Sequence, residues 1–222
     1  MMKPRILIAA EDSFDPNTGN GNIVLCKEYS DAVYHAGGTP LVALDIRTAK
    51  EYADVTDALL LIGGPVIHPA KYGSVVRDFS YLGGFSGTRD NMDFALAKLF
   101  LAQGKPILGI GRGAMVVNVL TGGTVNESIG EKGAETEDIL SGQMEKLLGK
   151  TITFKRSYGW GIGRLGEGMQ PEAIAPDGTV DAIVHKEKPV WGVVWHPEHP
   201  DDGAAPDNRL YEMFVSAAAS AD

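Results

Sequence analysis

The sequence contains little cysteine and no long apolar run. Cys26 is the only cysteine among 222 residues, so no disulfide can form within the chain. Such a composition is typical of a reducing compartment. The first apolar stretch, "RILIAA", is too short for the core of a signal peptide, and no run approaches the roughly 20 apolar residues that span a bilayer. We therefore expect a cytoplasmic protein that does not bind membranes.

Positive charge is scarce as well. The 20 Lys and Arg residues are outnumbered by 29 Asp and Glu residues, which gives a formal net charge of -9. A surface of this sign repels the phosphates of nucleic acids, so we expect no direct nucleic-acid binding. Hydrophobic residues make up 44% of the chain, enough for a full core, and the length suits one α/β domain over residues 1–222.

Strand-like and helix-like segments alternate up to residue 110. Short apolar runs predict strands, and stretches with helical periodicity predict helices. The predicted strands cover 4–10, 39–46, 58–64 and 106–110, the predicted helices cover 23–38, 49–58 and 88–105, and a polar loop is predicted over 11–22. Short connections favour right-handed crossovers and a parallel sheet between helices. The predicted fold is a three-layer α/β/α sandwich of the flavodoxin-like type with a mostly parallel central sheet.

The pattern changes beyond residue 126. Residues 126–150 are acidic and weakly periodic, and we expect a surface excursion there. Further strands are predicted at 151–157, within 172–185 around an Asp-Gly turn, and at 189–198. A helix at 208–220 is expected to close the fold.

A glycine-rich turn follows the predicted strand at 106–110. The apolar run "PILGI" leads into Gly-Arg-Gly, and an apolar, helix-like stretch begins at once. This is the shape of a nucleophile elbow, in which a tight turn lifts one side chain above a sheet. The residue at the tip, where a serine or cysteine would stand, is Gly111. Gly63 and Gly64 end a neighbouring strand, so both loops are expected at the rim where such folds bind ligands.

Four ordered blocks carry a resemblance to a known family. They are "LLIGGPVIHPAKYG" at 60–73, "TRDNMD" at 88–93, "PILGIGRGAMVVNVLTGGTV" at 106–125 and "APDGTVDAIVHKEKPVWGVVWHPE" at 175–198. Together they resemble the class I glutamine amidotransferase superfamily, in its γ-glutamyl-γ-aminobutyrate hydrolase-like branch. The resemblance covers nearly the whole chain and implies the same α/β fold.

The resemblance also implies site residues. In that family a cysteine thiolate attacks an amide, a histidine moves the proton and a glutamate orients the histidine. Carried over, the histidine is His196, the glutamate is Glu198, and the nucleophile position holds Gly111. The implied oxyanion donors are the backbone amides of Gly64 and Arg112. Neither a cofactor nor a metal is implied.

The substrate pocket departs from the family pattern. Val66, Asp93 and Met115 stand where the family usually has an acidic residue, Glu and Gln. In "FKRSYGWGIG", the family's pocket-lining segment, only Ser157 and Tyr158 are retained as ligand-binding candidates. Several changes together favour natural loss of the reaction over an engineered substitution.

Two functions remain open. The first is a pseudoenzyme without the catalytic cysteine, which binds a glutamine-like or γ-glutamyl ligand or a partner enzyme such as an amidoligase or synthetase. The second is an active γ-glutamyl amide hydrolase or glutamine amidotransferase, seen as a nucleophile mutant or using altered chemistry. Cys26 is interpreted as a small core residue on the apolar face of the first helix. The oligomeric state is undetermined, with a homodimer as one option.

Overall fold

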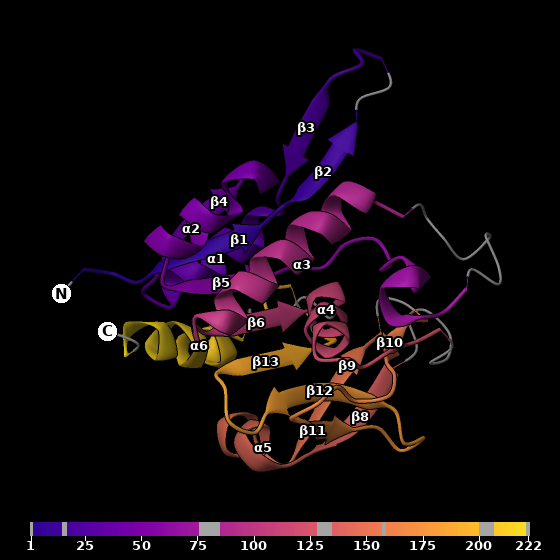
Figure 1. The fold of residues 1–222 in the computed structure, drawn as a ribbon. Coiled ribbons are helices and arrows are strands. Elements are labelled where there is room, and N and C mark those ends of the chain that lie inside the picture. The colour runs from indigo at the N-terminus through magenta and orange to yellow at the C-terminus, as the bar shows by residue number, and fades with distance from the viewer. Residues whose placement is uncertain are drawn as a thin grey trace.

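The computed structural model describes residues 2–14, 17–75, 85–127, 135–156, 159–199 and 207–220. One large mixed sheet runs through the molecule, with helices on both of its faces (Figure 1). Short apolar runs form its centre, because strands buried on both faces need apolar side chains in every position. The chain therefore has the predicted α/β fold with a mostly parallel central sheet.

The parallel part of the sheet positions the candidate site. Its strands pair in the order β4-β1-β5-β6-β13. Their bounds are β4 Thr39–Ala43, β1 Arg5–Ala9, β5 Ala58–Leu61, β6 Ile107–Ile110 and β13 Val190–Val193. Because these strands are parallel, their carboxyl ends meet at one edge, and the loops that follow β5, β6 and β13 lie together there.

An antiparallel extension continues the sheet beyond β13. The order is β13-β12-β11-β8-β9, and two short strands, β7 and β10, pair beside β12. The bounds are β7 Val125–Asn126, β8 Glu135–Leu140, β9 Thr151–Lys155, β10 Gly161–Ile162, β11 Met169–Ile174 and β12 Val180–His185. The predicted hairpin around the Asp-Gly turn is confirmed by the antiparallel pairing of β11 with β12.

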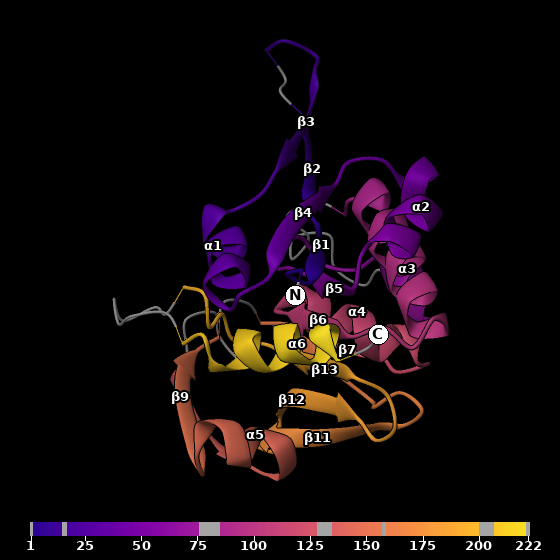
Figure 2. The ribbon, with the colours of Figure 1, turned by 90° about the vertical axis from the view of Figure 1, so that its left-hand side faces the viewer.

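Two sets of helices cover the two faces (Figure 2). Helices α1, α5 and α6 pack on one face, and α2, α3 and α4 pack on the other. Their bounds are α1 Lys27–His35, α2 Ala49–Val55, α3 Gly87–Ala102, α4 Arg112–Leu120, α5 Gly142–Leu148 and α6 Arg209–Ala219, with short 3-10 turns at Ile46–Thr48 and Pro69–Tyr72. None of the helices in the described segments has the length and apolarity that a membrane crossing requires.

The prediction of a loop at 11–22 is wrong. Strands β2 (Glu11–Phe14) and β3 (Gly21–Val24) form an antiparallel hairpin that projects from the body of the molecule (Figure 1). Its second strand takes residues that had been assigned to the first helix, which begins only at Lys27. Cys26 therefore stands just before the helix and is exposed, so its interpretation as a core residue is also wrong.

The surface excursion predicted at 126–150 is wrong for its described part. Residues 135–148 form β8 and α5, which belong to the sheet and to one helical layer. Along β8, exposed Glu135 and Glu137 alternate with buried Thr136 and Asp138. The period of two was hidden in the sequence because one of the inward-facing residues is an aspartate.

The buried Asp138 carries a carboxyl group inside the antiparallel extension. It accepts a hydrogen bond of 2.7 Å from Thr136 Oγ1. Asp181 is buried beside it and forms an ion pair of 2.7 Å with Arg156. Burial raises the pKa of Asp138 to about 7, and the negative charge of Asp181 acts in the same direction. The folded protein therefore favours a protonated carboxyl group here.

This environment predicts that stability falls as pH rises. The folded-state pKa of Asp138 lies above its ordinary value of 3.8, so the folded protein binds more protons than the unfolded chain between about pH 4 and pH 7. The free energy of unfolding should decrease across that window, by about 1.4 kcal/mol for each unit of pKa shift. Asp138→Asn should flatten the slope measured by urea unfolding at pH 5 and pH 8. Asp31→Asn, at a partly exposed position where the carboxylate pairs with Lys27, is the control. An unchanged slope in Asp138→Asn would contradict the assignment.

Candidate functional site

The turn after β6 has a backbone shape that favours glycine. Gly111 has φ +56° and ψ −113°, and α4 begins at the next residue. A side chain in this region is strained, whereas glycine enters it freely. The packing below the turn is equally close, because a Cβ atom on Gly113 would lie 2.2 Å from the carbonyl oxygen of Leu61. The sequence motif and this tight strand–turn–helix therefore agree.

His196 and Glu198 follow β13 and reach the same turn. His196 Nδ1 lies 2.8 Å from Glu198 Oε1, and Tyr211 donates a hydrogen bond of 3.0 Å to Glu198 Oε2. A carboxylate acceptor at Nδ1 favours the proton on that nitrogen, which leaves the Nε2 lone pair free. Nε2 faces the turn, since a Cβ atom built on Gly111 would lie 3.0 Å from it. The imidazole is therefore oriented as a base toward a residue without a side chain.

Tyr29 adds a contact that the sequence analysis missed. Its hydroxyl group lies 3.2 Å from His196 Nδ1 and accepts a hydrogen bond of 3.1 Å from the backbone N–H of Gly63. Burial raises the pKa of Tyr29 well above its usual range, and the charge of Glu198 adds to this, so the phenol stays neutral. Tyr29 lies on α1 and Tyr211 on α6, and neither stands in a motif. Only the packing of these helices brings them to the site.

Two backbone amides are left without an acceptor in the described part of the chain. The N–H of Arg112 opens α4, where the first turn has no partners within the helix. Among the described residues the N–H of Gly64 has no acceptor either, whereas the preceding amide of Gly63 donates to the hydroxyl group of Tyr29. Donors of this kind, together with the positive end of a helix dipole, favour an anion or a polarised carbonyl oxygen.

A cavity of about 450 Å³ opens beside Gly64 and the pair of His196 and Glu198. Its described lining comprises Glu11, Val24, Cys26, Glu28, Tyr29, Ile62, Gly63, Gly64, His196, Glu198 and His199. The hairpin strands and the start of α1 thus supply one wall, and the glycine loop and the dyad of His196 and Glu198 supply the other. The cavity is large enough for a small polar molecule.

The structure brings most of the predicted site residues together. Gly111, His196 and Glu198 meet at the turn, with the backbone of Gly64 and Arg112 beside them. Ser157 and Tyr158 lie outside the described residues. Cys26, expected in the core, lies at the cavity instead.

Comparisons with known proteins agree with this arrangement. A family profile for Peptidase C26 matches residues 8–198. The protein PB2B2.05 of Schizosaccharomyces pombe is 29% identical over 214 residues, which cover 85% of this chain and 80% of that protein. The gamma-glutamyl-gamma-aminobutyrate hydrolase PuuD of Escherichia coli K12 is 26% identical over 228 residues, which cover 90% of this chain and 88% of PuuD. A glutamine amidotransferase from Thermotoga maritima has a similar fold, with a TM-score of 0.60 at 14% identity, covering 89% of this chain and 77% of that one.

The fold and the site define a glutamine amidotransferase-like α/β protein. The chain belongs to the Peptidase C26 family, whose relatives include gamma-glutamyl hydrolases. The resemblance stated from the four sequence blocks is confirmed at this level.

The turn predicts a specific cost for adding a side chain. Gly111→Ala should lower the free energy of unfolding by about 1–3 kcal/mol, because a Cβ atom is strained at this φ and ψ and crowds His196. Gly73 is the matched control: it is left-handed, at φ +72° and ψ +21°, with open space around it. Gly73→Ala should cost only about 1 kcal/mol. Equal losses in urea unfolding would show that Gly111 is not strained or crowded beyond an ordinary left-handed turn.

Proposed function

We propose that this protein is a pseudoenzyme that binds a glutamine-like or γ-glutamyl ligand and does not cleave it by the thiol route. One observation carries the proposal. His196 Nε2 faces the Gly111 turn, where the family's cysteine would stand, and the dyad and both unpaired amides surround a residue with no nucleophilic atom. The imidazole and the two backbone N–H groups fit an amide or carboxylate group of a ligand. The nucleophilic side chain that would attack this group is absent at residue 111.

The arrangement suits recognition of a γ-carbonyl group. The ligand's carbonyl oxygen would accept hydrogen bonds from the N–H groups of Gly64 and Arg112. In a cysteine-dependent relative the thiolate would attack the carbonyl carbon and the histidine would protonate the leaving amine. Here no covalent acyl-enzyme can form at Gly111. Loss of a nucleophile typically lowers the rate by several orders of magnitude, which leaves binding as the main property of the site.

A protein that binds a ligand without converting it is expected to act through a partner protein. The proposal includes a partner that makes or uses amide nitrogen, such as an amidoligase or synthetase. The charge balance of the chain, with 29 acidic against 20 basic residues, favours a partner surface that is basic.

The first test compares the protein with its Gly111→Cys form. The unmodified protein should bind L-glutamine, L-glutamate or a γ-glutamyl amide in calorimetric titrations and release no ammonia or amine. Gly111→Cys should release it measurably, since the base, its orienting glutamate and both amides are in place. Gly111→Cys combined with His196→Ala is the control and should be inactive. No binding to any of these compounds by the unmodified protein would contradict the proposal.

A second candidate function rests on Cys26. This thiol lines the same cavity as His196 and Glu198, which favours an active hydrolase with altered chemistry as the alternative. Under the pseudoenzyme proposal, Cys26→Ser should leave the ammonia-release assay at background, as in the unmodified protein. If the unmodified protein releases ammonia or amine and Cys26→Ser does not, the result supports the alternative instead.

A further inference from the structure

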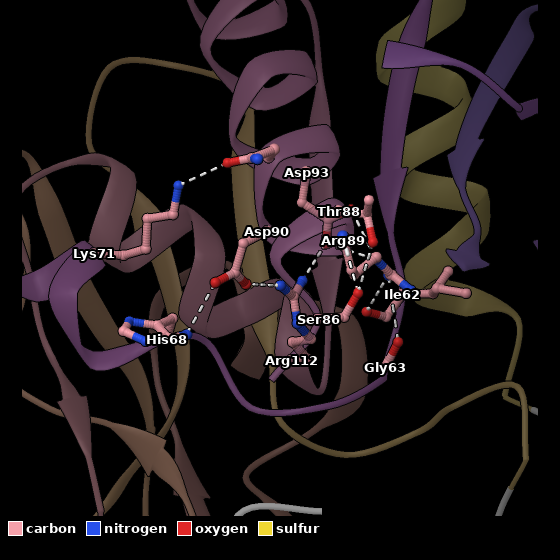
Figure 3. Close-up of polar contacts among 11 residues, drawn as sticks. Ile62, Gly63, His68, Lys71, Ser86, Thr88, Arg89, Asp90, Asp93 and Arg112 are labelled. Carbon is pink, nitrogen blue, oxygen red and sulfur yellow. Dashed lines mark hydrogen bonds and ion pairs between the residues drawn. The ribbon is translucent and has the colours of Figure 1, made fainter. Parts of the chain in front are cut away.

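Two arginines and two aspartates form a buried network beside the glycine loop (Figure 3). Arg89, Asp90 and Asp93 come from the first two turns of α3, and Arg112 is the first residue of α4. All four side chains are almost completely buried. The network has two positive and two negative charges, so it is electrically balanced inside the protein.

Arg89 joins the network to the glycine loop. Its Nε lies 2.9 and 3.0 Å from the two carboxylate oxygens of Asp93. Its Nη2 donates to the backbone carbonyl oxygens of Ile62, at 3.3 Å, and Gly63, at 3.4 Å (Figure 3). One guanidinium group therefore binds a carboxylate on α3 and two carbonyl groups of the loop that follows β5.

Arg112 joins the same network to the elbow. Its guanidinium group forms ion pairs with both Asp90 and Asp93. Asp90 also accepts a hydrogen bond of 3.0 Å from the backbone N–H of His68, further along the glycine loop. Asp93 is thus shared by Arg89, which binds the loop, and Arg112, whose own backbone N–H lies at the elbow.

The contacts of Arg89 fix the direction of the next amide. In a trans peptide the C=O and N–H groups point in opposite directions. Because the carbonyl group of Gly63 points to Arg89, the N–H of Gly64 in the same peptide points away from the network. Gly64 and the dyad line the cavity on that other side. Gly64 has φ +148°, a conformation that depends on glycine and that an external contact must select.

We propose that Arg89 is a positioning residue that holds the N–H of Gly64 toward the cavity, and that Asp93 couples this amide to that of Arg112. The two anion-binding donors are thereby fixed relative to each other before any ligand arrives. The positions of the two backbone N–H donors do not depend on a nucleophilic side chain. This explains why the pair of donors is present beside Gly111. The ligand part of this inference rests on the proposed function, and the orientation of the peptide does not.

Arg89→Lys separates positioning from general stability. A lysine keeps a positive charge near Asp93 but lacks the fork that also reaches the two carbonyl groups. In a crystal structure of Arg89→Lys, the Gly63–Gly64 peptide should rotate so that the carbonyl group of Gly63 no longer points to residue 89 and the N–H of Gly64 no longer points to the cavity. Calorimetric titration with L-glutamate should show affinity reduced at least tenfold.

The matched control is Arg156→Lys. Arg156 is also buried, and its ion-pair partners within the described residues, Asp181 and Asp177, belong to the antiparallel extension and not to the glycine loop. This variant should lose thermal stability to a similar extent and keep the Gly63–Gly64 peptide in place. Asp93→Asn is the second test if Arg89→Lys does not fold. It removes the shared charge while keeping the shape, and it should displace the Gly64 amide as well.

The outcomes are distinct. A rotated peptide in either network variant, with an unmoved peptide in Arg156→Lys, supports positioning. An unmoved peptide in every network variant that folds overturns it, whatever happens to stability. If the unmodified protein binds none of L-glutamine, L-glutamate and the γ-glutamyl amide but the peptide rotates in the variants, the proposed function fails and the positioning role stands.

Discussion

The buried carboxylate of Glu198 is the group on which the geometry of the site depends. A carboxylate inside a protein is costly unless hydrogen bonds compensate for lost water. Glu198 receives them from His196, which follows β13, and from Tyr211 on α6, while Tyr29 on α1 contacts the same imidazole. One acidic group therefore links a strand end to two of the three helices that cover one face of the sheet. The imidazole cannot turn without disturbing all three elements.

The second constraint lies on the opposite face of the sheet. There the network of Arg89, Asp90, Asp93 and Arg112 connects α3, α4 and the glycine loop. Asp93 stands where the family is expected to have glutamate, yet it binds both arginines. This substitution has therefore not broken the network. All four charged groups that support the backbone donors are therefore present and paired.

The central sheet and the turn at Gly111 could be predicted from the sequence alone. The strands at 4–10, 58–64 and 106–110 are apolar on both faces, and glycines end two of them, so both type and position were readable. The hairpin at 11–24 was missed because its polar residues are typical of loops and its apolar end, at Ile23 and Val24, mimics the start of a helix. Strand β8 was missed because Asp138 occupies an inward position. Cys26 was misplaced by the same error in the start of α1.

The tyrosines that contact His196 and Glu198 could not be predicted from the sequence. Glu198 lies two residues from His196, and the motif indicates their pairing. Tyr29 is 167 residues from His196, and its role depends on how α1 packs on the sheet. Contacts that arise from packing between distant helices leave no periodic or spacing signal in a single sequence.

The turn at Gly111 sets what a side chain at this position would cost. Glycine adopts the conformation freely, whereas any residue with a Cβ atom would carry strain there. A side chain would also require His196 to move by a few tenths of an ångström. If the proposed function holds, folding stability favours glycine at this turn. A nucleophile would then persist only where selection for the reaction outweighs its cost in stability.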